Sequence, residues 1–101
     1  MIPKINLEYN LRKQGDREKL LHQKVVVESS GQNRQAVNIG ELIGILPIKG
    51  GNYQFLILGS TLRTYVPATE ITSIRLHDIA DPLQASYDPK THMFVLRSRA
   101  A

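Results

Sequence analysis

Histidines and aspartates are the side chains of this sequence best suited to chemistry, and their spacing argues against a shared site. No two of the three histidines, His22, His77 and His92, are spaced like a pair of metal ligands. Neighbouring side chains in a strand point to opposite faces, so His77 and Asp78 would point apart. We therefore expect no metal site and no histidine that acts as a general base.

Three aspartates near the C-terminal end are better explained by turns than by catalysis. Two nearby carboxylates can divide the roles of general acid and general base, which makes Asp78, Asp81 and Asp88 candidates. However, Asp81 precedes Pro82 and Asp88 precedes Pro89, and an aspartate before a proline is typical of a turn. These aspartates are accordingly interpreted as turn residues.

The sequence also lacks the motifs of other common catalytic and cofactor sites. No serine stands in a G-x-S-x-G pattern, and no glycine-rich loop leads into a helix. The absence of cysteine excludes thiol nucleophiles, cysteine-bound zinc and disulfides. We expect a protein that is not an enzyme and has no catalytic residues, no bound metal and no cofactor.

Basic residues near the N-terminus are the candidates for contact with RNA or DNA. The net charge is +4, and residues 1–24 hold six Lys or Arg against three acidic residues, whereas residues 25–80 hold four of each. Lysine and arginine side chains neutralise the phosphates of a nucleic-acid backbone. The candidates for nucleic-acid contact are Arg12, Lys13, Arg17, Lys19 and Lys24. The alternative interpretation is a solvated basic flank that keeps the protein soluble.

The N-terminal third is expected to contain two strands and a short helix. Ile5, Leu7, Tyr9 and Leu11 alternate with polar residues, which is the pattern of a half-buried strand. Asp16 could then cap a short helix over residues 17–23, with a basic loop as the alternative. Three consecutive valines predict a strand over residues 24–29, and the polar run at residues 29–35 predicts a loop.

From residue 40 onward the sequence predicts a succession of short strands. Gly50 and Gly51 lie between two long apolar runs and indicate a hairpin turn, because glycine accepts a positive φ. Pro67 cannot donate a ladder hydrogen bond, so a strand should end there. The predicted strands cover residues 42–48, 53–58, 62–66, 70–76, 83–88 and 93–97, the last two forming a second hairpin.

The central hairpin has apolar residues on both of its faces. A strand with one face in water should alternate between apolar and polar residues, and residues 42–48 and 53–58 do not. Fully burying a Leu or Ile side chain contributes about 1.5–3 kcal/mol, so the outward apolar residues need cover. The N-terminal segment, the C-terminal hairpin or another chain could supply it. The expected contacts with another chain are Ile43, Ile45, Leu56 and Leu58, although the inward and outward sets could be exchanged.

The layout of the central region resembles that of a known barrel superfold. GELIGIL at residues 40–46, the hairpin that follows and ITSI at residues 71–74 are similar to the strands of SH3-like and Sm-like domains. The resemblance implies a mainly β fold with a small bent barrel, a short N-terminal helix and an added C-terminal β-hairpin. It concerns architecture and transfers no binding residues. We divide the chain into a basic N-terminal flank (1–23), the barrel (24–78) and a C-terminal hairpin with its tail (79–101).

The functional expectation is a non-enzymatic interaction module. We expect it to be a homo-oligomer, or a small subunit of a larger assembly, that binds itself or another protein chain through an apolar hairpin face. An RNA- or DNA-binding protein is the alternative. The first residues lack the apolar stretch of a signal peptide, and no apolar run approaches the roughly 20 residues that span a bilayer. We therefore expect no membrane span and a cytoplasmic location.

Overall fold

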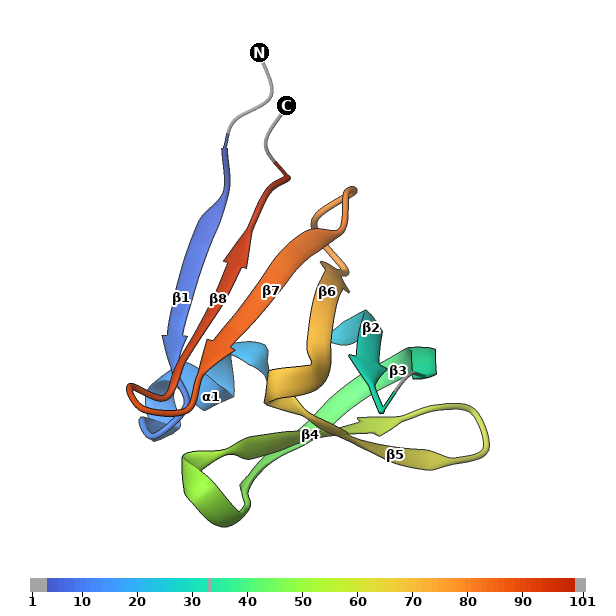
Figure 1. Ribbon diagram of the computed structural model, residues 1–101. Helices are drawn as coiled ribbons and strands as arrows, with labels where there is room; N and C mark the ends of the chain where they lie inside the picture. The colour runs from blue at the N-terminus through green and yellow to red at the C-terminus, as the bar shows by residue number, and fades with distance from the viewer. Residues whose placement is uncertain (1–3, 33, 100–101) are drawn as a thin grey trace.

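The eight strands in the described part of the chain belong to one antiparallel sheet. The structure is a computed structural model, and it describes residues 4–32 and 34–99. Along the sheet the strands follow the order β1-β8-β7-β6-β2-β3-β4-β5 (Figure 1). Their bounds are β1 Asn6–Asn10, β2 Lys24–Gly31, β3 Arg34–Pro47, β4 Tyr53–Leu58, β5 Arg63–Pro67, β6 Ile71–Leu76, β7 Leu83–Asp88 and β8 Met93–Arg97.

The two ends of the chain meet at one edge of the sheet. Strand β1 pairs antiparallel with β8, and the Ser98 amide donates a hydrogen bond to the Ile5 carbonyl at 2.9 Å (Figure 1). The alternation of residues 5–11 is confirmed as a strand pattern, with Tyr9 and Leu11 buried. Alternation reveals a strand but not its partner, so the pairing of β1 with the last strand could not be predicted.

The helix α1 spans Gln14–Leu20, three residues earlier than the expected 17–23. Asp16 lies inside its first turn, so the expectation that Asp16 caps it is wrong. The Asp16 carboxylate instead accepts a hydrogen bond from the Asn10 amide at 2.7 Å, which ties the helix to the end of β1. Leu20 is buried, and burial of this residue holds the helix on the sheet.

Strands β2 and β3 form a ribbon that is longer than the sequence predicted. The expectation of a loop over residues 29–35 is wrong, because β2 continues to Gly31 and β3 begins at Arg34. Serine and glutamine are weak strand formers, but here Ser29 is buried and also pairs with Ile71 of β6. Tertiary pairing therefore overrides local propensity in this segment.

A bulge in β3 changes which side chains face the core. The register with β4 shifts between Leu42 and Gly44, so that Ile43 is the extra residue. Strict alternation would place Leu42 and Ile45 on opposite faces, yet both are buried. The strict alternation expected for residues 42–48 is therefore wrong, and Ile45 belongs to the buried side with Leu42.

The turn between β3 and β4 is fixed by the C-terminal hairpin β7–β8. Gly50 and Gly51 have φ values of +78° and +76°, which confirms the use of glycine there, but the loop spans residues 48–52 and contains the short 3-10 helix η1 (Lys49–Gly51). The Tyr87 hydroxyl of β7 donates a hydrogen bond to the Gly51 carbonyl at 2.8 Å. A second contact joins the two hairpins: Phe55 of β4 packs on Phe94 of β8, with ring centroids 4.9 Å apart.

The expected fold class is confirmed: the protein is mainly β, with a short N-terminal helix and an added C-terminal hairpin. Strands β6, β2, β3, β4 and β5 are consecutive in the sheet, and β5 leads to β6 through the 3-10 helix η2 (Ala68–Glu70). The sheet is not closed, since no ladder among the described strands joins its outermost members, β1 and β5. The resemblance to SH3-like and Sm-like barrels stays a prediction.

None of the helices in the described ranges is long and apolar enough to cross a membrane.

Candidate interaction surface

The three-stranded part of the sheet formed by β3, β4 and β5 has a buried inner side. Phe55 and Ile57 of β4 are at most 1% exposed, and they lie beside Ile45 and Leu42 of β3 in the ladder. The C-terminal hairpin covers this side, as the contact between Phe55 and Phe94 shows. The inner side of the β3–β4 hairpin is therefore covered by the chain's own C-terminal hairpin, one of the three possibilities that the sequence allowed.

The opposite side of the same strands remains open. Gly44, Leu56 and Tyr65 are paired across β3, β4 and β5, so their side-chain positions share one face. Leu46 and Leu58 lie on that face two residues further along β3 and β4. Leu46 is 41% exposed, Leu58 40% and Tyr65 54%, while Leu56 between them is half-buried. We call Leu46, Leu56, Leu58 and Tyr65 the outer apolar face.

A shallow dip in the outer apolar face lies over Gly44. A Cβ atom at Gly44 would lie 3.5 Å from Leu56 Cβ and 3.9 Å from Leu46 Cγ, which is ordinary van der Waals contact. The dip thus lies between two leucines and has room for about one methyl group.

The four residues expected to contact another chain do not lie together. Leu56 and Leu58 lie on the outer apolar face, Ile43 is half-buried at the bulge, and Ile45 is 6% exposed and belongs to the core. Ile45 is therefore removed from the candidate surface, and the bulge is the reason. Leu46 and Tyr65 belong to the surface instead, although neither was among the expected contact residues.

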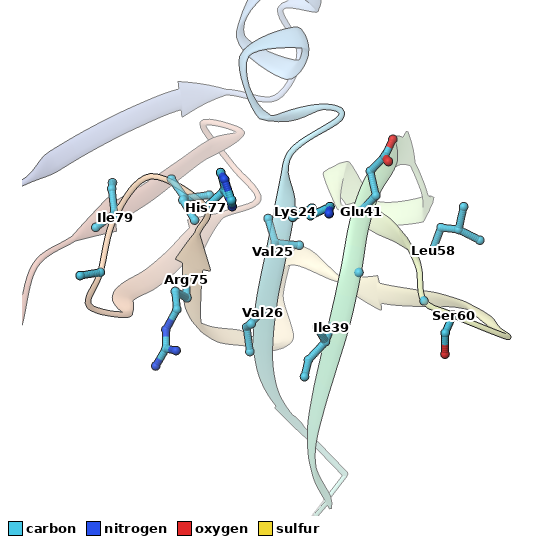
Figure 2. Close-up of a pocket in the computed structure, with 14 residues that line it drawn as sticks. Lys24, Val25, Val26, Ile39, Glu41, Leu58, Ser60, Arg75, His77 and Ile79 are labelled. Atoms are coloured by element: carbon cyan, nitrogen blue, oxygen red, sulfur yellow. The ribbon is translucent and has the colours of Figure 1, made fainter.

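A groove of about 770 Å³ adjoins the outer apolar face at Leu58. Val26 of β2 and Ile39 of β3 lie side by side between Arg75 of β6 and Leu58 at the end of β4 (Figure 2). Lys24, Glu41 and His77 add charged or titratable groups to its lining. Because these residues come from four strands, only the folded sheet brings them together, and no sequence signal could have shown the groove.

The five basic residues predicted to contact nucleic acid have different roles in the fold. Arg12 and Lys13 are exposed between β1 and α1, whereas the half-buried Arg17 donates a hydrogen bond to the Leu11 carbonyl at 2.6 Å. Lys19 lies 3.8 Å from an Asp16 carboxylate oxygen. Lys24 lines the groove at the start of β2. Arg12 and Lys13 are therefore exposed together in one turn. Arg17 and Lys19 lie close to groups of the same chain, and Lys24 belongs to the groove.

Two histidines of the described residues lie close to another polar side chain. His22 Nδ1 lies 3.4 Å from a Glu41 oxygen at the surface, and His92 Nδ1 lies 3.4 Å from the Tyr87 hydroxyl. Across the described residues, no group of three or more His, Asp and Glu side chains could hold a metal ion.

Two tyrosines have an altered acidity, and burial is the main cause in both. Burial raises the pKa of the Tyr9 phenol above its ordinary value, and the Asp16 carboxylate raises it further. Burial likewise raises the pKa of Tyr87, followed by the effects of Tyr53 and Asp88. Burial is thus the largest cause of both shifts, and neighbouring titratable groups add to it.

Comparison of the chain with protein-family models, with characterised proteins and with solved structures finds no match.

Proposed function

We propose that this protein is a non-enzymatic interaction module that binds another protein chain, either its own copy or a second subunit, through the outer apolar face. The supporting observation is the exposure of Leu46, Leu58 and Tyr65 on one face of a sheet whose other side already has a complete core. Glu41 and Arg63 flank Leu58 in the ladder, so charged residues border this apolar face. Apolar surface with a polar rim can mark a site of contact with another protein. Burying it against a partner would remove the apolar area from water.

The position of the face in the sheet supports a protein partner. Tyr65 lies on β5, the last strand of the sheet, whose far edge has no strand partner in the described part of the chain. A partner could therefore cover the apolar side chains as far as the outermost strand of the sheet. Tyrosine is enriched in the buried centre of protein–protein interfaces.

A charge placed in the outer apolar face tests this proposal. The variant Leu58→Glu should abolish copurification of the partner chain, or the higher mass of a self-associated form, because it would place a charged carboxylate in an apolar contact. Gln84→Glu is the matched control, since Gln84 is exposed on β7 and gains the same charge elsewhere. If Leu58→Glu and wild type show the same partners and the same mass in solution, this face is not the binding surface.

Binding of RNA or DNA through the N-terminal basic residues is the second candidate function. It is supported by Arg12 and Lys13, which are exposed together in the turn before α1. The expected sign is an affinity that falls steeply with salt and weakens when both residues become alanine. Electrophoretic mobility shifts at low salt measure this, and the absence of any shift would remove the candidate.

A further inference from the structure

The first part of β3 has one strand edge without a partner. Residues 34–38 pair with β2, while the ladder with β4 begins only at Glu41. Gly59, just after β4, still lies beside Ile39, since a Cβ on Gly59 would be 3.4 Å from the Ile39 carbonyl oxygen. The chain then turns away. Residues 34–38 therefore have no second strand partner within the described ranges.

This edge lacks the features that usually protect an exposed strand. Natural edge strands are guarded by charged side chains or by prolines. Strand β1 has Glu8, and β5 has Arg63 and Pro67, so both outermost strands follow that rule. Residues 35–38 of β3 have neither a charge nor a proline, and the one charge of the segment, Arg34, lies at its end.

Exposed β-branched side chains accompany the free edge. Val37 is 61% exposed and Ile39 is 68% exposed, although valine and isoleucine are usually buried. Both lie on the sheet face that also holds the groove, where Ile39 is part of the lining. Figure 2 shows the Ile39 side chain on β3 beyond the end of β4. A strand added at this edge would satisfy backbone groups and shield these side chains together.

We propose that residues 34–38 pair antiparallel with the same segment of a second copy, joining two sheets about a two-fold axis. A self-pairing strand must be compatible with its own charge pattern, and this one is. With Ala36 opposite Ala36 of the second copy, Gln35 faces Val37 and Arg34 faces Asn38, so no like charges meet. Dimers with two-fold symmetry are the commonest protein oligomers.

This register also keeps corresponding faces together. Directly opposite residues of an antiparallel pair share a face, and Gln35 and Val37 lie on the same face of β3. Pairing Gln35 with Val37 of the other copy therefore places the two exposed valines on one continuous surface. A register shifted by one residue would turn the groove faces of the two copies to opposite sides. The contact uses a different part of β3 from the outer apolar face, so the two proposals can fail separately.

Three double variants test the pairing, because each adds two charges at the two facing positions. In Gln35→Glu/Val37→Glu and in Gln35→Lys/Val37→Lys, like charges would oppose each other twice across the dimer axis. In Gln35→Lys/Val37→Glu, opposite charges would meet twice. We expect each like-charge variant to raise the dimer Kd about tenfold or more, and the opposite-charge variant to restore or strengthen the dimer.

Sedimentation equilibrium of the full chain measures these constants. The range should run from about 10 µM to about 1 mM, because so short a contact is expected to bury less than the roughly 1,200 Å² of a stable interface. The variants change exposed residues, and far-UV circular dichroism checks that they remain folded. A dimer that follows the charge pattern of the three variants supports the proposal.

Three other results would overturn it. Wild-type protein that stays monomeric over the whole range excludes pairing with a second copy. A dimer of equal stability in all three variants shows that the edge of β3 is not the contact. If Leu58→Glu abolishes the dimer while the variants at residues 35 and 37 leave it unchanged, the contact lies on the outer apolar face. The proposed function would then stand, and pairing through the edge of β3 would be excluded.

Discussion

At the scale of single residues, the bulge at Ile43 decides which apolar side chains of β3 are buried in the core and which are exposed. Leu42 and Ile45 are both buried, and Leu46 beyond them is exposed. Strand periodicity alone cannot locate an inserted residue, because the apolar pattern of residues 42–46 fits either face. The sequence therefore allowed the prediction of an apolar hairpin but not of its outward set.

Truncating one residue of each set should separate these two roles. Ile45→Ala removes a buried side chain and leaves a cavity, so the free energy of unfolding should fall by about 2–5 kcal/mol. Leu58→Ala changes a side chain that is 40% exposed and should cost less than about 1 kcal/mol. Urea denaturation followed by far-UV circular dichroism measures both. Equal losses would mean that Ile45 does not face the core.

Tyr9 should make stability fall at alkaline pH. Its pKa is raised in the folded protein, mainly by burial and also by Asp16, whereas in the unfolded chain a phenol ionises near pH 10. The contribution is thus fully present below pH about 10, and it is lost as pH rises through the folded pKa. The midpoint of urea unfolding should be flat near neutral pH and decrease above pH about 10.

Replacing the phenol tests this assignment. Tyr9→Phe keeps the ring in the core and removes its ionisation, so the alkaline decrease in the unfolding midpoint should become smaller. Tyr65→Phe is the control, because it removes a phenol that is 54% exposed. An alkaline decrease of the same size in Tyr9→Phe and wild type would show that other groups cause it, with Tyr87 the next to replace.

At the scale of elements, local patterns predicted most strands, and long-range contacts set the remaining boundaries. Strands β7 and β8 have the bounds that their alternation and the Asp88-Pro89 turn indicate. The strand expected over residues 24–29 lies within β2. The far end of the β2–β3 ribbon was not predicted, because serine and glutamine favour loops and the pairing there also depends on β6. The groove and the free edge of β3 were missed for a similar reason, since both depend on where β4 ends relative to β3.

Two glycines of the central hairpin should respond in opposite ways to an added methyl group. Gly44 has ordinary space for a Cβ, so Gly44→Ala should stabilise the protein by about 0.5–1 kcal/mol by reducing the freedom of the unfolded chain. Gly51 has φ +76°, and its Cβ would lie 2.9 Å from the Pro89 carbonyl oxygen. Gly51→Ala should therefore destabilise by more than about 1 kcal/mol.

Thermal and urea unfolding of the two alanine variants provide the measurement. The difference between them measures the combined cost of the positive φ at Gly51 and of its contact with the β7–β8 hairpin, because both changes add the same methyl group to the same hairpin. If Gly51→Ala proves as stable as Gly44→Ala, the turn does not need its positive φ and does not press against the C-terminal hairpin.

At the scale of the whole molecule, the three parts expected from the sequence contribute to one core. Leu11 and Leu20 from the N-terminal flank are at most 1% exposed, and so are Leu83, Phe94 and Leu96 from the C-terminal hairpin. Backbone hydrogen bonds join the parts as well: the His22 amide donates to the Leu42 carbonyl at 2.7 Å, and the Leu42 amide donates to the Gln23 carbonyl at 2.9 Å. The buried residues of both flanks belong to this core, and the outer apolar face of β3, β4 and β5 stays exposed.

Isolated residues 24–78 should consequently fail to fold. Losing a single buried Phe costs about 3–5 kcal/mol, and the fragment loses Phe94 together with four buried leucines of the flanks. That loss exceeds the total stability of a typical domain, which is about 5–15 kcal/mol. The fragment should show poorly dispersed amide resonances and no cooperative melting, whereas the full chain should unfold in one transition that circular dichroism and tyrosine fluorescence report at the same temperature. A well-dispersed spectrum of residues 24–78 would instead establish the barrel region as a self-sufficient unit, and the flanks would then be attachments to it and not part of its core.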